Sequence, residues 1–157
     1  MSIKRKYVTT LREIENIINS NNFDNKSKIK EVLKILRKNF AKYNWIGIYL
    51  LQGDKLVLHE YDGDKETQHK IIPLDKGLCG LAAREKRIVN VSDVSLNPFY
   101  LECFPETKSE LIIPIFKNGD IIGEIDIDSY KLNAFDSNDE WFITKVASII
   151  VKLYNFI

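Results

Sequence analysis

The spacing of the apolar residues changes at Trp45, and no other feature of the sequence constrains the fold as strongly. Before this point, apolar side chains recur at helical spacing in two stretches, which predicts two amphipathic helices. The first stripe is Tyr7, Leu11, Ile14 and Ile18, and the second is Ile29, Leu33, Leu36 and Phe40. After Trp45, short apolar runs alternate with turn residues, as expected of β-strands.

Two β-hairpins are predicted in the second part of the chain. Residues 45–51 and 56–59 flank a turn at Gly53, and residues 111–116 and 121–128 flank Asn118-Gly119, the strongest local hairpin signal in the sequence. Between the hairpins we expect a polar loop at 62–66, a short strand at 70–72, a short helix beginning at Gly77, a strand at 88–91 and a turn-rich loop at 92–105.

A last helix is predicted to begin with Ser137 and Glu140 at the spacing of a capping box. It carries Phe142, Val146, Ile149 and Leu153 on one face. The order of elements predicts an α+β fold, in which a predominantly antiparallel sheet has the N-terminal and C-terminal helices packed on one face. We expect one domain over residues 1–157, a length within the usual range of single domains.

Composition disfavours several classes of partner. The net charge of +1 comes from 23 basic and 22 acidic residues spread through the chain, which provides no electrostatic footprint for nucleic acid or an anionic membrane. No stretch approaches the roughly 18 apolar residues that a membrane span needs. With only two cysteines, a secreted disulfide scaffold is disfavoured, and a bridge between them would be transient. We expect a soluble, cytoplasmic protein.

The strand at 121–128 carries a row of acidic side chains. Alternation places Glu124, Asp126 and Asp128 on one face together with Ile122. This face is either solvated or lines a polar pocket, and Ile122 favours the pocket. Glu110 joins the face only if the hairpin loop has three residues, which puts it opposite Asp126; a two-residue turn puts it opposite Ile127 and points it away.

The two cysteines lie in different surroundings. Cys79 is near the start of the short helix, where the helix dipole and free amides can lower a thiol pKa, although a lone cysteine in such a place is more often a small buried packing residue. Cys103 lies in the long loop, where a purely structural residue has less reason to be. Glu102 and Glu106 would oppose thiolate formation there, with Lys108 as the nearby compensating charge.

Other chemistries find little support. The zinc ligands available, His59, His69, Cys79 and Cys103, lack the close pair spacings of structural zinc sites, so we expect no metal. The sequence also lacks a glycine-rich phosphate loop, a serine nucleophile elbow and a His-Glu-x-x-His motif. Phosphoryl transfer and serine hydrolysis are therefore disfavoured.

Four segments together resemble the GAF-domain free methionine-(R)-sulfoxide reductases. They are Asn44-Trp45-Ile46-Gly47-Ile48-Tyr49-Leu50, Lys76-Gly77-Leu78-Cys79-Gly80-Leu81-Ala82, Ser109-Glu110-Leu111-Ile112-Ile113-Pro114 and Gly123-Glu124-Ile125-Asp126-Ile127-Asp128-Ser129. The match runs from about Trp45 to Asp139. Ordinary GAF domains share the fold without this combination of motifs and the loop cysteine.

The resemblance implies a role for each motif residue. Cys103 corresponds to the catalytic cysteine and Cys79 to a resolving cysteine, which form a disulfide that a thioredoxin-like protein reduces. Trp45 and Tyr49 correspond to an aromatic wall around the methyl end of free methionine sulfoxide. Glu110, Asp126 and Asp128 correspond to the acidic cluster that binds the ammonium group and assists at the sulfoxide oxygen. The resemblance implies no cofactor and allows a homodimer.

Three residues depart from the family pattern. His69 stands where many members have a third cysteine, Phe104 where an aspartate is common, and Glu124 where an apolar residue is usual. Two other hypotheses stay open: a non-catalytic GAF module that binds a small ligand or senses redox state, and a dimerisation domain with Phe142, Val146 and Ile149 as its seam.

Overall fold

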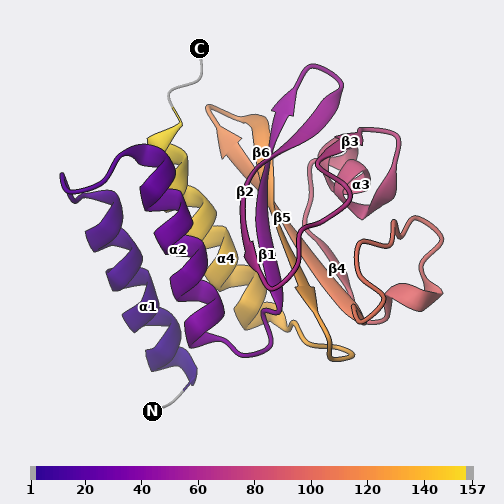
Figure 1. Cartoon of the computed structure of the whole chain (residues 1–157), viewed down its shortest axis with the longest axis horizontal. Coiled ribbons are helices and arrows are strands. Elements are labelled where there is room, and N and C mark those ends of the chain that lie inside the picture. The colour runs from indigo at the N-terminus through magenta and orange to yellow at the C-terminus, as the bar shows by residue number, and fades with distance from the viewer. Residues whose placement is uncertain (1–2, 155–157) are drawn as a thin grey trace.

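The computed structural model describes residues 3–154, so the ends of the predicted domain, 1–2 and 155–157, lie outside the described residues (Figure 1). Its elements in chain order are α1 Ile3–Ile18, α2 Asn25–Asn39, β1 Trp45–Gln52, β2 Lys55–Gly63, β3 Ile71–Pro73, α3 Gly77–Glu85, β4 Val89–Val91, the 3₁₀ turn η1 Val94–Leu96, β5 Ser109–Lys117, β6 Asp120–Ser129, α4 Ser137–Ile150 and the 3₁₀ turn η2 Val151–Leu153.

The strands form one antiparallel sheet in the order β3-β2-β1-β6-β5-β4. Helices α1, α2 and α4 lie on one side of it, and α3 with the 92–107 segment lies on the other (Figure 1). The predicted α+β fold is therefore confirmed, including the shared face of the N-terminal and C-terminal helices. Within residues 3–154, none of the helices combines the length and hydropathy that a membrane span requires.

Both faces of the central strands are covered. Ile46, Ile48 and Leu50 of β1 point into the larger apolar core between the sheet and the helices, whereas Trp45 and Tyr49 point into a smaller cluster beneath α3. This alternation is the period of two expected of a strand. The helix side uses the predicted stripes, since Tyr7, Ile14, Leu33, Leu36 and Phe142 are all buried in the larger core.

Phe142, Val146 and Ile149 of α4 also belong to the larger core and are buried. Because these side chains already pack within the chain, the hypothesis of a dimer seam formed by them is wrong. Burial on the inner face of a helix needs no partner molecule.

Two local predictions need correction. Strand β2 continues to Gly63 where a loop was expected at 62–66, because Asp62 and Gly63 pair with Ile46 and Trp45 of β1. The capping box of α4 begins one residue earlier than predicted. Asp136 is the N-cap, and its side chain accepts hydrogen bonds from the backbone N–H groups of Asn138 and Asp139. In return, the backbone N–H of Asp136 donates to the Asp139 carboxylate.

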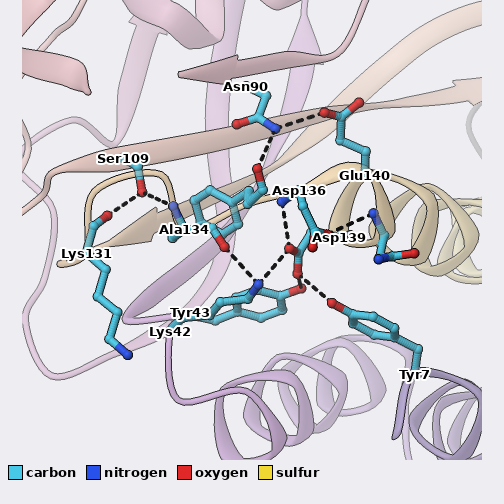
Figure 2. Close-up of polar contacts among 12 residues, drawn as sticks. Tyr7, Lys42, Tyr43, Asn90, Ser109, Lys131, Ala134, Asp136, Asp139 and Glu140 are labelled. Carbon is cyan, nitrogen blue, oxygen red and sulfur yellow. Dashed lines mark hydrogen bonds and ion pairs between the residues drawn. The ribbon is translucent and has the colours of Figure 1, made fainter. Parts of the chain in front are cut away.

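Asp139 also joins α4 to the two N-terminal segments (Figure 2). Its carboxylate is fully buried, accepts hydrogen bonds from the hydroxyls of Tyr7 at 3.0 Å and Tyr43 at 2.7 Å, and pairs with the Lys42 ammonium at 2.6 Å. Burial and the nearby Asp139 raise the pKa of both tyrosines, so the hydroxyls remain donors at neutral pH. A buried charge is tolerated only when it is paired and hydrogen-bonded in this way.

We expect Asp139→Asn to lower the free energy of unfolding by about 3 kcal/mol, because it removes the acceptor charge from Lys42 and the two hydroxyls. Urea unfolding at pH 7 measures the change. The matched control is Glu66→Gln, which removes an exposed ion pair with Lys70 and should change stability by less than about 0.5 kcal/mol. Equal effects of the two substitutions would show that the buried network does not stabilise the fold.

Candidate active site

A β-bulge sets the alignment of the acidic residues. The β5–β6 turn has two residues, Asn118 and Gly119, both with positive φ, and Lys117 pairs with Asp120. The pairing then shifts, because Phe116 is opposite Ile121 while Ile115 is opposite Gly123. The extra residue in β6 brings Glu110 directly opposite Asp128.

Glu110 therefore lies with the acids as predicted, but the β-bulge in β6 produces this alignment. The three-residue loop that was expected to produce it is wrong, as is the pairing of Glu110 with Asp126. The placement of Ile122 beside the acids is also wrong, since Ile122 packs against the helix-side core and Ile121 against the cluster beneath α3. A bulge reverses the alternation at the point where it occurs.

Four carboxyl groups are buried on the face of the sheet beneath α3. Glu110 is 5% exposed, Glu124 0%, Asp126 2% and Asp128 2%. A solvated outer face is thereby excluded. Burial raises the pKa of all four, and for Glu110 and Asp128 the charge of Asp126 raises it further. Carboxyl groups in this environment hold protons at pH values where exposed ones are ionised.

Aromatic side chains stand beside the acids as the resemblance implied. Trp45 is opposite Asp128, and Tyr49 is opposite Glu124, so both project to the acidic face. A Cβ at Gly47 or at Gly63 would overlap the indole of Trp45, which explains glycine at these two positions. Phe104, one of the departures from the family pattern, packs against the same indole with ring centroids 5.8 Å apart.

Cys79 lies in α3 with its side chain turned toward the sheet. The thiol is buried and donates a hydrogen bond to Asp126 Oδ2 at 3.5 Å. Burial raises the pKa of Cys79 well above its usual value, and the charges of Asp126 and Glu124 raise it further. The expectation that the helix start would lower this pKa is wrong, because desolvation and like charges outweigh the dipole.

Cys103 lies over the acids in the loop of residues 97–107, called here the Cys103 loop. Burial, followed by the charges of Asp126 and Asp128, raises the pKa of Cys103 to about 12. The thiol is therefore protonated at neutral pH while the cavity is closed. Of the two glutamates predicted to oppose ionisation, Glu102 does raise the pKa of Cys103, whereas Glu106 is held on the surface by an ion pair with Lys65 at 2.6 Å.

Both cysteines line one small cavity. Its walls also include Glu110 and Asp126, and its volume is about 10 Å³, which is space for about one water molecule. A ligand as large as an amino acid can enter only if the covering segment moves. The Cys103 loop is the cover, since Leu101 and Cys103 form that wall.

Besides the packing of Phe104 on Trp45, three polar contacts help to hold the Cys103 loop in place. The His69 ring donates from Nε2 to the carbonyl of Glu102 at 2.9 Å, Lys65 pairs with Glu106, and the Thr107 hydroxyl donates to Asp128 Oδ2 at 3.0 Å. His69, the second departure from the family pattern, is itself fixed by the Tyr49 hydroxyl, which donates to its backbone carbonyl at 2.8 Å. These contacts, on both sides of Cys103 in the sequence, hold the loop closed over the cavity.

Several buried polar atoms around the cavity have no hydrogen-bond partner among residues 3–154. They are Trp45 Nε1, the Tyr100 hydroxyl, Asp126 Oδ1, Asp128 Oδ1 and both carboxyl oxygens of Glu124. Since unsatisfied buried polar groups are costly, a group of them marks a place where a polar ligand binds. Glu124 was left out of the predicted site, although the strand alternation had already put it on the acidic face.

Comparisons with known proteins agree on one family. A model of the GAF domain matches residues 26–152. The free methionine-R-sulfoxide reductase of Saccharomyces cerevisiae is 39% identical over 113 residues, 69% of this chain and 62% of that protein. The structure of a type II free methionine-R-sulfoxide reductase from Thermoplasma acidophilum is 41% identical, with TM-score 0.80 over 82% of this chain and 91% of that one.

A structure of free methionine-R-sulfoxide reductase from Neisseria meningitidis, in complex with its substrate, is 30% identical to this chain. It has a TM-score of 0.88 and covers 98% of this chain and 91% of its own. The likeness therefore extends over nearly the whole fold.

We expect Glu124→Gln to flatten the dependence of stability on pH. Above about pH 4.5 an unfolded glutamate loses its proton while folded Glu124, with its raised pKa, retains it, so the wild type loses stability as pH rises from that value to the folded pKa. The relative gain of Glu124→Gln should grow by up to about 1.4 kcal/mol per pH unit over this window. Urea unfolding at pH 5, 6, 7 and 8 measures it, and parallel profiles for the two proteins would contradict the assignment.

Proposed function

The chain belongs to the GAF domain family and, within it, to the free methionine-(R)-sulfoxide reductases, and from this premise we propose that it reduces free methionine-(R)-sulfoxide to methionine. The observation that carries the proposal is the common cavity of Cys79, Cys103, Glu110 and Asp126. Two thiols and carboxyl groups with raised pKa are the components that sulfoxide reduction followed by disulfide formation requires.

In the first step, the sulfur of Cys103 attacks the sulfoxide sulfur. The S–O bond breaks, the oxygen and a proton pass to Cys103 as sulfenic acid, and methionine leaves; the sulfoxide is reduced and Cys103 is oxidised. A buried carboxyl supplies the proton to the departing oxygen. Glu110 and Asp128 suit this role, because burial raises the pKa of both and they lie opposite each other on β5 and β6.

Substrate binding would itself activate Cys103. The substrate's ammonium group is the natural partner for Asp126, whose Oδ1 is buried without a hydrogen-bond partner among the described residues. After burial, the charge of Asp126 does most to raise the pKa of Cys103, so a cation placed beside Asp126 lowers that pKa again. Thiolate would then form only when substrate fills the site.

The aromatic wall supports recognition of the rest of the substrate. Trp45, Tyr49 and Phe104 provide apolar surface for the methyl end, and the unpartnered indole N–H of Trp45 is a donor for a substrate oxygen. The buried acids suit a free amino acid better than a residue within a peptide, because a peptide has no ammonium group at that position.

In the second step, Cys79 resolves the sulfenic acid. The Cys79 thiol attacks the sulfur of Cys103 sulfenic acid, the disulfide forms and the hydroxyl leaves as water with the thiol proton. A dithiol protein of the thioredoxin type then reduces the disulfide by exchange, becoming oxidised itself. The shared cavity supports this step, since Cys79 and Cys103 both line it.

Methionine formation tests the proposal. Wild-type protein should produce methionine from the free R-sulfoxide with thioredoxin, thioredoxin reductase and NADPH, whereas Cys103→Ser should produce none. Cys79→Ser should stop at about one methionine per chain, because its sulfenic acid has no resolving thiol. Binding of the sulfoxide without turnover by the wild type would support the non-catalytic GAF module instead.

Alkylation of Cys103 by iodoacetamide should be slow near pH 7 and rise about tenfold per pH unit up to pH 10, because its pKa of about 12 lies above this range. His69→Ala should raise the rate several-fold at each pH by freeing the carbonyl of Glu102. Mass spectrometry of the modified peptide measures both effects.

The matched control is His59→Ala, which removes the other histidine at its ring contact with Tyr154. A plateau in the alkylation rate near pH 9 would contradict the raised pKa of Cys103. Equal rates for the two histidine variants would contradict the role of His69 in holding the Cys103 loop closed.

A further inference from the structure

The structure assigns a second ligand to the active-site cavity: we propose that the reduced, substrate-free protein binds one Zn²⁺ ion through Cys79, Glu110 and Asp126, and that the ion blocks turnover. The inhibition rests on the proposed function, whereas the binding of the ion does not. No two of these ligands are close in the sequence, so residue spacing gave no reason to expect a metal site.

Three elements bring the ligand atoms together. Cys79 comes from α3, Glu110 from β5 and Asp126 from β6, and all three residues are buried. The Cys79 sulfur and one carboxylate oxygen from each acid lie within 4.8 Å of one another. The same three residues line the cavity of about 10 Å³, which has room for a single ion but not for an amino acid.

The distances suit tetrahedral zinc. Zn–S bonds of about 2.3 Å and Zn–O bonds of about 2.1 Å place neighbouring ligand atoms roughly 3.4–3.6 Å apart. Cys79 Sγ and Asp126 Oδ2 are already 3.5 Å apart, and Glu110 needs only a small side-chain movement. The sulfur ligand favours a thiophilic cation over Mg²⁺ or Ca²⁺, which prefer oxygen alone.

Unpartnered oxygens provide an independent reason for a cation here. Asp126 Oδ1 and Asp128 Oδ1 are buried and have no hydrogen-bond partner in the part of the chain that the structure describes. Asp128 lies on the same face of β6 as Asp126 and opposite Glu110, so it extends the ligand set on one side. A water molecule or Asp128 completes the four ligands that zinc requires.

Binding and catalysis exclude each other. Zinc displaces the proton of Cys79 and the proton of Glu110, and both pass to solvent. The zinc–thiolate bond removes the resolving thiol, and the ion occupies Asp126, which the substrate's ammonium group needs. The disulfide form cannot bind the ion, because its Cys79 sulfur is already bonded to Cys103. Zinc would therefore hold only the reduced protein and protect its thiol from oxidation.

Cobalt(II) is the spectroscopic probe for this site. Titration of the reduced full chain with CoCl₂ under argon should give one equivalent of binding, with a thiolate-to-cobalt charge-transfer band in the near ultraviolet that ZnCl₂ abolishes. Cys79→Ser should lose the band, and Cys103→Ser, the matched control, should keep it. Glu110→Gln should keep the band but bind cobalt at least tenfold more weakly, which tests the site even if Cys79→Ser fails to fold.

Absence of the band in the wild type, its loss in Cys103→Ser rather than Cys79→Ser, or its persistence in the disulfide form would overturn the site. Methionine formation is assayed in parallel with EDTA and with added ZnCl₂. Turnover that zinc inhibits at the concentration where it displaces cobalt supports the full proposal. A cobalt band without turnover in EDTA refutes the reductase function alone, whereas turnover that saturating zinc leaves unchanged refutes the inhibition.

Discussion

Burial of four carboxyl groups on one face of a sheet is the constraint on which the rest of the structure depends. Glu110, Glu124, Asp126 and Asp128 share a region of low dielectric, where like charges repel strongly and water cannot screen them. Burial raises the pKa of each member, which lowers the amount of charge that must be buried at once. The raised pKa values lower the stability of the fold at neutral pH. They also provide the acids that the proposed proton transfer to an oxygen leaving group requires.

The fold separates the stabilising core from this face. On the helix side, Ile46, Ile48 and Ile127 join the apolar residues of α1, α2 and α4 in one large core. The carboxylate of Asp139 is buried beside this core, and two tyrosine hydroxyls and a lysine ammonium satisfy it. The opposite face can therefore carry unsatisfied polar atoms without loss of the fold.

Sequence reasoning succeeded where local pattern decides the structure. The helical stripes, the two hairpins and the acidic alternation follow from residue spacing. The two cysteines singled out by the family motifs line one cavity, and the two aromatic residues project to the acidic face. Sequence reasoning failed where one residue changes the register. Asn118-Gly119 correctly indicates a two-residue turn, but the bulge that realigns Glu110 depends on packing on both faces of β6. The pKa of Cys79 likewise depends on residues distant in sequence. The same is true of the hydrogen bond from the His69 ring to the carbonyl of Glu102.

The segment that covers the cavity also carries Cys103, the nucleophile of the proposed reaction. In that reaction, opening of the Cys103 loop to admit substrate would move Cys103 away from the acids, so the two would act together only after the loop has closed again. Peroxide in the medium meets this sulfur chiefly in the open state, when no acid is positioned beside it. Hyperoxidation of the thiol to sulfinic acid should therefore increase with the rate of turnover, because each cycle exposes it once.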